Sequence, residues 1–191
     1  MEKNRCSWCL GDDLYQHYHD TEWGVPLFDD QRLFEFLILE TFQAGLSWIT
    51  VLRKREAFRN AFDHFNVEKV ASYDSIKMDT LMGNAAIIRN NLKIKAAVKN
   101  AQAYISVQEQ YGSFSSYIWN FVNGRPVVNH HQFVKEFPPY TPLAVTISKD
   151  LKKKGFSFVG PTVVYAHMQA TGMVNDHTTS CFRYAEVQLK G

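Results

Sequence analysis

The sequence lacks any long hydrophobic run and any strong excess of one charge. Its 191 residues carry a formal net charge of +2, which does not by itself indicate a nucleic-acid partner. No apolar stretch approaches the roughly 20 residues that a membrane-spanning helix needs, and the start of the chain has no apolar signal segment. These absences argue against a membrane protein and predict a cytoplasmic protein with reduced cysteines.

Strand-like alternation, internal repeats and low-complexity segments are also missing. Apolar residues recur instead at spacings of three and four, the period of an amphipathic helix. With 46% hydrophobic and 14% aromatic residues, the chain can bury a substantial core. We therefore expect an all-α fold in a single domain covering residues 1–191.

Capping residues and helix-breaking residues define the expected helices. They are predicted over residues 33–42, 48–62, 67–73, 75–82, 92–111, 114–121, 142–154 and 162–171. Ser47 and Asn91 are the expected N-caps of the second and fifth of these helices. The stretch 123–142 contains proline and glycine and is expected to be irregular.

Cysteine is scarce, with three residues against seven histidines, yet two of the cysteines are paired with histidines near the ends of the sequence. Cys6 and His19 lie near the start of the chain, and His177 and Cys181 lie four residues apart near its end. Residues four apart share one face of a helical turn. Two Cys/His pairs fill the tetrahedral shell that zinc prefers. The spacing favours a structural zinc site with no position for a catalytic water.

Other interpretations of these residues stay open. The pairing can arise by chance among scattered histidines and cysteines. Cys6-x-x-Cys9 is itself a metal or redox spacing, although no βαβ pattern surrounds it. His17 competes with His19 as a ligand. We expect Cys9 to be a spare thiol.

A short glycine-bounded turn follows a lysine-rich helix end. Gly155 and Gly160 enclose the turn, and Lys152, Lys153 and Lys154 precede it. Glycine allows the backbone to turn tightly and to present amide groups at a helix N-terminus, where a phosphate is favoured. The pattern is typical of a helix-hairpin-helix over about 142–171 that binds DNA. A plain turn between two helices with a solvated lysine face is the alternative.

Glu40 is anomalous because it lies within an apolar helix. A buried carboxylate without a partner is unfavourable, so such a residue is hydrogen-bonded, exposed on a polar stripe, or functional. Aromatic residues are frequent nearby in the sequence: Trp8, Tyr15, Tyr18, Trp23, Phe42 and Trp48. Each can simply belong to the core. Together with a buried acid, they could form a slot for a flat heterocycle.

Four strings in this order resemble the 3-methyladenine DNA glycosylase I family. They are YHDTEWGVP at 18–26, AGLSWITVL at 44–52, GFSFVG at 155–160 and VNDH at 174–177. The resemblance extends from about Cys6 to Tyr184. It implies a two-lobed, all-α glycosylase of the helix-hairpin-helix superfamily. Such an enzyme hydrolyses the N-glycosidic bond of 3-methyladenine in alkylated double-stranded DNA and releases free 3-methyladenine.

The resemblance also implies roles for individual residues. Glu40 matches the carboxylate that recognises the base, and we take it as the catalytic residue. The expected base-binding residues are aromatic: Tyr18, Trp48, Trp8, Tyr15 and Trp23. One structural zinc ion is implied at four ligands: Cys6, His19, His177 and Cys181. We expect DNA contacts from a loop that wedges into the duplex and from the hairpin: Leu46, Gly45, Gly155, Val159, Gly160 and Lys153.

Rival functions remain at this stage. A non-enzymatic helix-hairpin-helix DNA-binding protein with a structural zinc would bind DNA and release no base. A zinc hydrolase would need an open metal site, and a glycosylase with strand-cleaving activity would need a nucleophilic lysine. We expect a monomer that releases the base without strand cleavage. Asp176 lies where many relatives carry a catalytic aspartate, and its role is left open, as is the effect of Thr41 and Phe42 on the pocket.

Overall fold

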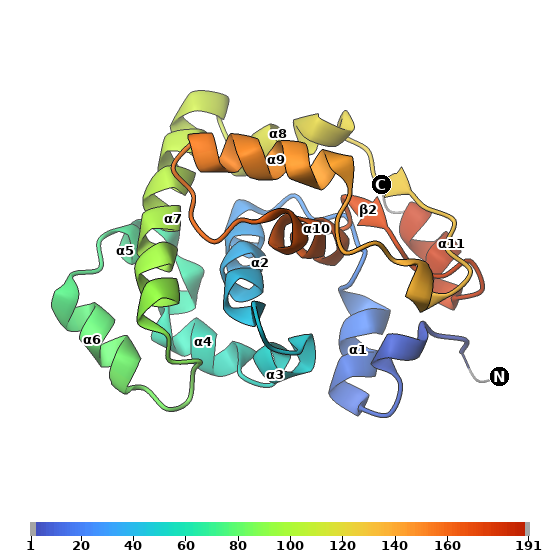
Figure 1. Cartoon of the computed structure of the whole chain (residues 1–191), viewed down its shortest axis with the longest axis horizontal. Helices are drawn as coiled ribbons and strands as arrows, with labels where there is room; N and C mark the ends of the chain where they lie inside the picture. The colour runs from blue at the N-terminus through green and yellow to red at the C-terminus, as the bar shows by residue number, and fades with distance from the viewer. Residues whose placement is uncertain (1–2, 190–191) are drawn as a thin grey trace.

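The computed structural model describes residues 3–189, which form a mostly helical fold with one short parallel strand pair (Figure 1). The helices and strands are α1 Asp13–Thr21, α2 Asp30–Gln43, α3 Trp48–Leu52, α4 Arg55–Ala61, α5 Val67–Ala71, α6 Ser75–Gly83, α7 Asn91–Tyr111, α8 Phe114–Trp119, β1 Val127–Val128, α9 Pro142–Lys153, α10 Pro161–Ala170, β2 Val174–Asn175 and α11 Phe182–Gln188. Short 3-10 turns occur at Ser7–Cys9, Asp63–Phe65, Asn120–Val122 and Val134–Glu136. Within residues 3–189, no helix combines the length and apolar character that crossing a bilayer requires.

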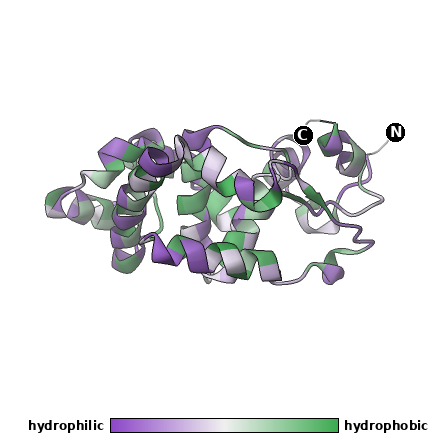
Figure 2. Ribbon diagram, turned by 90° about the horizontal axis from the view of Figure 1, so that it is seen from above, coloured by the Kyte–Doolittle hydropathy of each residue, from purple (hydrophilic) through white to green (hydrophobic). Residues whose placement is uncertain are grey.

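Helix α2 forms the centre of the core. Every residue from Leu33 to Phe42 is buried, including the polar Glu35, Glu40 and Thr41, and a helix that is apolar around most of its circumference belongs inside a protein. It packs against α7 on one side and against α10 on another. Hydrophobic and hydrophilic stretches alternate along the outer helices, as expected for helices that bury one side (Figure 2).

The segment that begins at Asn4 and the segment before α11 lie side by side at one end of the molecule. Helices α1 and α11 lie near each other there (Figure 1). The backbone amide of Phe182 donates to the carbonyl of Asn4 at 2.9 Å, and the Asn4 side chain donates to the carbonyl of Ser180 at 2.8 Å. Pairing of β1 with β2 fixes the segment just before His177. These contacts place both pairs of expected metal ligands in the same region.

Helices α9 and α10 pack against each other and are joined by the loop 154–160. The loop begins at Gly155, whose φ of +98° lies in the region that favours glycine. The Ser148 hydroxyl donates to the carbonyl of Val159 at 2.6 Å. The Asn100 side chain accepts from the amide of Ser157 and donates to its carbonyl. The expected pair of helices is therefore present, with ends that differ by one residue from the prediction.

Several local predictions were wrong. The single helix expected over 48–62 is two helices, because the chain breaks at Arg53 and Lys54. Ser47 does not cap it through a backbone amide; its hydroxyl forms a hydrogen bond with the Thr50 hydroxyl. Asn90, rather than Asn91, caps α7 by accepting from a backbone amide. The strand pair was not expected, since two-residue strands are too short to show alternation.

Candidate active site and metal cluster

Residues from both halves of the chain enclose a cavity of about 180 Å³. All six residues expected to recognise the base line it, and four further residues complete its wall. The lining residues are Trp8, Tyr15, Tyr18, Trp23, Glu40, Gln43, Trp48, Phe137, Ala166 and Gln169. They come from the turn before α1, from α1, α2, α3 and α10, and from loops. The structure thus brings the expected aromatic group and the anomalous carboxyl group to one cavity.

Glu40 is placed on this cavity by the central helix α2. Its side chain is 3% exposed, and its Oε2 atom has no hydrogen-bond partner among the described residues. Burial disfavours the charged form and raises the pKa of Glu40 to about 8. Burying a carboxyl group without a partner is unfavourable. A ligand that offers a hydrogen-bond donor or a positive charge would remove this unfavourable contribution, so the site favours binding of such a ligand.

Aromatic rings form the walls of the cavity. The ring centroids of Trp8 and Tyr15 lie 4.7 Å apart, and those of Trp8 and Trp23 lie 5.0 Å apart. On another wall Tyr18 and Trp48 are 5.6 Å apart. The indole Nε1 atoms of Trp8 and Trp48 are buried without partners among the described residues. The walls therefore offer flat faces for stacking a heterocycle.

Two tyrosines, Tyr15 and Tyr18, also belong to the cavity lining. Burial, with a smaller contribution from the charge of Glu40, holds the pKa of Tyr18 well above its ordinary value. Burial also raises the pKa of Tyr15 to about 12. Both hydroxyls are therefore neutral near pH 7 and can donate hydrogen bonds.

Local contacts hold α1 and the turn after it against the α3–α4 region. Asp12 caps α1 by accepting from the amide of Tyr15 at 2.9 Å, and it pairs with Arg53. After the helix, the Glu22 carboxylate accepts two hydrogen bonds from the Arg55 guanidinium, at 2.7 and 2.8 Å. A bidentate, largely buried pair of this kind constrains geometry strongly. It holds the residue that follows α1, the helix of Tyr18, against the first residue of α4.

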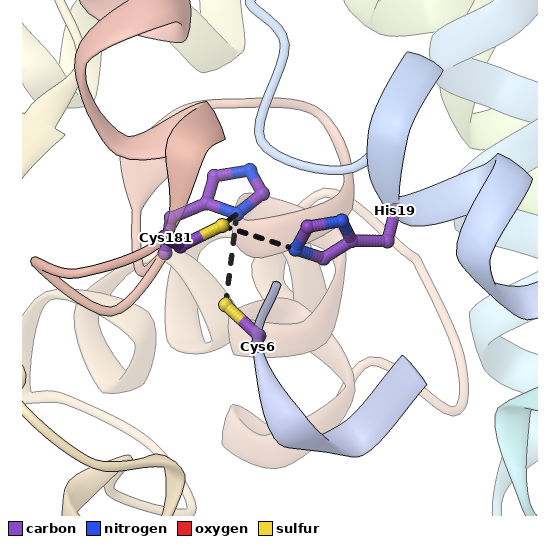
Figure 3. A group of neighbouring side chains, drawn as sticks. Cys6, His19 and Cys181 are labelled. Atoms are coloured by element: carbon purple, nitrogen blue, oxygen red, sulfur yellow. Dashed lines mark hydrogen bonds between the residues drawn. The ribbon is translucent and has the colours of Figure 1, made fainter. Parts of the chain in front are cut away.

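Cys6, His19, His177 and Cys181 converge beside the cavity, and all four are buried. Figure 3 shows Cys6, His19 and Cys181 pointing toward one another from three separate segments. Cys181 Sγ lies 3.4 Å from His19 Nε2 and 3.6 Å from His177 Nδ1. Cys6 Sγ lies 3.7 Å from His177 Nδ1. Ligand atoms around a tetrahedral zinc ion are about 3.3–3.8 Å apart, given its bond lengths. The cluster could therefore hold a metal ion.

The outer nitrogen of each histidine has its own partner. His19 Nδ1 lies 2.9 Å from the Asp20 carboxylate. His177 Nε2 lies 3.0 Å from the carbonyl of Trp23. Because these acceptors take the ring N–H groups, the opposite nitrogens face the cluster with free lone pairs. Gly24 permits the close approach, since a Cβ there would lie 3.0 Å from His177 Nε2.

The reason given for the His177 and Cys181 pair was wrong, although the two side chains do meet. The residues between them form a turn, not a helix, and Cys181 is the N-cap of α11. The amide of Cys181 donates to the carbonyl of Thr178 at 2.8 Å, which closes the turn. Cys9 is buried with its thiol directed to the carbonyl of Cys6 and is not among the four converging ligands.

The residues expected to contact DNA lie in two separate regions of the structure. Gly45, with φ of +86°, lies in the loop between α2 and α3, and the neighbouring Leu46 is 42% exposed. At the hairpin, Lys153 is exposed as the last residue of α9, whereas Val159 in the loop is fully buried. The whole Val159 residue has no exposed surface, and its carbonyl already accepts from the Ser148 hydroxyl, so the expected DNA contact of Val159 has no accessible atom in this structure. The amine of Lys154 donates to the hydroxyl of Tyr111 at 2.9 Å.

The sequence interpretation missed four lining residues: Gln43, Phe137, Ala166 and Gln169. Gln43 follows Glu40 by three residues on α2, a spacing that shares a helix face. The same spacing relates Ala166 to Gln169 on α10. Phe137 gave no such signal because it lies in an irregular segment, where it stacks on Trp23.

Two residues noted in the sequence lie outside the cavity lining. Phe42 packs against Phe58, with ring centroids 4.8 Å apart, in the core. Asp176 is fully buried and is surrounded by hydrogen-bond donors, including the hydroxyl of Tyr165. Neither side chain lines the cavity.

The sequence was compared with known protein families and with individual proteins. The family model described as methyladenine glycosylase matches residues 8–184 of the chain. The DNA-3-methyladenine glycosylase of Haemophilus influenzae is 46% identical over 177 residues, which cover 93% of this chain and 96% of that protein. DNA-3-methyladenine glycosylase 1 of Escherichia coli is 46% identical over 180 residues, covering 94% and 96% of the two chains.

Solved structures agree with the sequence comparison. A structure of 3-methyladenine DNA glycosylase I from Staphylococcus aureus, described as showing the basis of 3-methyladenine recognition, superposes with a TM-score of 0.91. The two sequences are 39% identical, and the match covers 94% of this chain and 96% of the other.

Proposed function

The chain belongs to the methyladenine glycosylase family, and from that premise we propose how its pocket performs the reaction. It is a DNA-3-methyladenine glycosylase, which hydrolyses the N-glycosidic bond between 3-methyladenine and deoxyribose in alkylated DNA. The observation that carries the assignment of its active site is the unpartnered Glu40 carboxyl group at an aromatic cavity.

The enzyme must first bring the base out of the duplex. Extrusion costs a few kcal/mol of lost stacking and pairing, so the pocket must return comparable contacts. Trp48 and Trp8 would stack on the extruded ring, at roughly 1–3 kcal/mol for each contact. The hydroxyl of Tyr18 would donate a hydrogen bond, while Tyr15 and Trp23 would close the wall. The dimensions and aromatic lining of the cavity support these roles.

Recognition would depend on the positive charge of the lesion. Methylation at N3 makes the adenine cationic, and a cation is favoured both by aromatic faces and by a carboxylate. Burial raises the pKa of Glu40 to about 8 in the empty pocket, so the carboxyl group is largely protonated at neutral pH. A cationic base would lower that pKa and leave the carboxylate to accept from the exocyclic amine.

Bond cleavage would then need little acid catalysis, because the cationic base leaves with the bonding electrons as neutral 3-methyladenine. Positive charge passes to the sugar, where DNA phosphates and the Glu40 carboxylate would stabilise it. Water adds to C1′ of the sugar and releases a proton. The described lining of the cavity contains no lysine amine to attack the sugar, which supports base release without strand cleavage.

Zinc is the metal that best suits the cluster. Cys6, His19, His177 and Cys181 would hold it with two thiolates and two imidazoles, a structural set without an open position. The bound ion would tie the two ends of the chain together and so stabilise the fold. The spacing of the ligand atoms and the fixed outer nitrogens support this assignment.

Binding to DNA would use two separate elements of a helix-hairpin-helix glycosylase. Backbone amides of the hairpin, around Gly155 and Gly160, would meet a phosphate at the start of α10, with Lys153 adding positive charge. Leu46, exposed beside Gly45, would enter the gap left by the extruded nucleotide. Its exposure on a loop next to the α2 helix of Glu40 supports that role.

Chromatography of bases released from methylated duplex DNA tests the function, with a gel run without alkali to detect strand breaks. We expect free 3-methyladenine and no breaks. DNA binding without base release would favour the non-enzymatic alternative. Breaks that appear together with base release would contradict the monofunctional mechanism.

A further inference from the structure

Gln169 lines the base pocket from α10, an element that carries none of the expected recognition residues. Its backbone carbonyl accepts from the amide of Gly24 at 3.1 Å. This hydrogen bond connects α10 to the segment that follows α1. Its side-chain Nε2 donates to Oδ2 of Asp176 at 2.8 Å. The Oε1 atom of Gln169 forms no hydrogen bond with any residue between 3 and 189.

The contact with Asp176 determines which way the amide points. A carboxylate offers only acceptors, so the amide must present its NH₂ group to Asp176. The carbonyl oxygen of Gln169 is then directed away from Asp176. The side-chain amide of a glutamine without such a partner can rotate by 180° and exchange the positions of its NH₂ group and its oxygen. The amide of Gln169 is held in a single orientation.

Asp176 is itself held in place by other donors. It is fully buried, with the hydroxyl of Tyr165 donating to Oδ2 at 2.6 Å. The Asn129 amide donates to Oδ1, also at 2.6 Å. Burial raises the pKa of Tyr165, so its hydroxyl remains a donor. With donors on both oxygens, Asp176 cannot turn to release the Gln169 amide.

We propose that Gln169 is a specificity-determining residue whose carbonyl oxygen accepts a hydrogen bond from the base, and that Asp176 is the positioning residue that fixes its orientation. The proposal rests on the glycosylase function given above. Adenine carries an amine at C6, and guanine carries a carbonyl oxygen there. An acceptor of fixed orientation pairs with the amine and opposes the carbonyl, since two acceptors repel and leave each other unsatisfied.

The first test replaces the amide by a side chain of similar length that forms no hydrogen bond, Gln169→Met. Affinities for free 3-methyladenine and free 3-methylguanine are measured by calorimetry, and their ratio is compared with that of the wild type. We expect affinity for 3-methyladenine to fall by about three- to tenfold, the usual value of one neutral hydrogen bond. Affinity for 3-methylguanine should stay constant or rise.

Gln132→Met is the matched control. Gln132 is exposed and lies outside the cavity lining, so its substitution should leave both affinities unchanged. Equal losses for the two bases in Gln169→Met, or an unchanged ratio, would overturn the proposal, because a general packing defect does not discriminate between an amine and a carbonyl.

A second variant, Asp176→Asn, tests the positioning role. An asparagine that presents its NH₂ group to Gln169 would reverse the amide and point the Gln169 donor into the pocket. We expect the preference to shift toward 3-methylguanine by more than in Gln169→Met, and Gln169→Met combined with Asp176→Asn should remove that additional shift. An additional shift that persists in the double variant would disprove the coupling. If Asp176→Asn does not fold, Gln169→Met alone decides whether the carbonyl selects the base.

Failure of the glycosylase function and failure of the Gln169 role give different results. If the wild type binds neither base and releases none from methylated DNA, the proposed function is wrong. If the wild type releases 3-methyladenine while Gln169→Met keeps the wild-type ratio, only the role of Gln169 is wrong.

Discussion

The base pocket and the Cys/His cluster are adjacent, yet they differ in whether their buried polar atoms have hydrogen-bond partners. In the pocket, Glu40 Oε2 and the indole nitrogens of Trp8 and Trp48 are buried without partners. In the cluster, the outer nitrogens of both histidines have acceptors within 3.0 Å. Buried polar atoms usually have hydrogen-bond partners, so the atoms without partners indicate where a ligand binds. The fully oriented cluster is suited to holding the structure in place.

The two regions are also physically connected. Tyr18 and His19 are consecutive on α1, and the first lines the pocket while the second joins the cluster. Trp23 contributes its ring to the pocket wall and its carbonyl to His177. A metal at the cluster would therefore position pocket residues without touching the base. Substitutions that affect one region and spare the other test this division.

The largest effect is expected from removing a cluster ligand. Cys181→Ser should abolish stoichiometric zinc binding and lower the free energy of unfolding by at least about 3 kcal/mol, because the ion binds only the folded chain. Zinc content by atomic absorption and unfolding by denaturant are the measurements. Cys9→Ser is the matched control and should keep the metal. Full zinc content in Cys181→Ser together with loss in Cys9→Ser would reverse the ligand assignment.

Glu40→Gln should disable the pocket while leaving the cluster intact. The substitution keeps the shape of the side chain and removes its negative charge, so excision of 3-methyladenine should fall by about 10²–10³-fold, as for loss of a charge-stabilising group. Single-turnover excision rates test this, with zinc content as the internal control. A wild-type rate would remove Glu40 from the mechanism.

The same substitution should make the protein more stable above mildly acidic pH. The pKa of Glu40 is about 8 in the folded protein against an ordinary 4.5, so the folded state holds the proton more tightly than the unfolded state. Wild-type stability should then fall as pH rises from about 4.5 to about 8, relative to Glu40→Gln. The expected difference at pH 8 is roughly 4 kcal/mol, at about 1.4 kcal/mol for each unit by which the pKa is raised.

Urea unfolding of both proteins across that pH range gives the comparison. The two curves should converge at the acidic end, where Glu40 is protonated in both states. A constant difference at every pH would mean that the effect arises from packing and not from ionisation.

The smallest effect is expected from Tyr18→Phe, which separates two neighbouring residues with different roles. The hydroxyl of Tyr18 forms no hydrogen bond with the described part of the chain, so its loss removes only a contact to the base. Excision should fall by about three- to tenfold, with melting temperature and zinc content unchanged. Loss of zinc in this variant would show that the pocket and the cluster cannot be separated.

Much of the site was predictable from the sequence because it depends on ordered motifs. Glu40 was recognisable as an acid within an apolar helix, and all five expected aromatic residues do line the cavity. The four expected ligands converge as well. Five of these residues lie within the four family motifs, namely Tyr18, His19, Trp23, Trp48 and His177.

Other features depended on contacts between distant segments. The 48–62 helix breaks at Arg53 and Lys54, where Arg53 pairs with Asp12 across 41 residues of sequence. His177 and Cys181 meet through a turn, and helical spacing predicted the contact for the wrong reason. Phe137 enters the pocket from an irregular segment, which no periodic pattern describes.

The sequence by itself determined the helical class and the acid in the apolar helix, because each follows from residue type and local spacing. The resemblance to the family identified the four converging residues, which residue type and spacing alone had left open. Only the tertiary structure decided which polar atoms are left unpaired and which way the Gln169 amide points. Those properties depend on partners such as Asp176 and on burial by segments far apart in the chain. Desolvation and hydrogen-bond orientation arise only when such segments pack together.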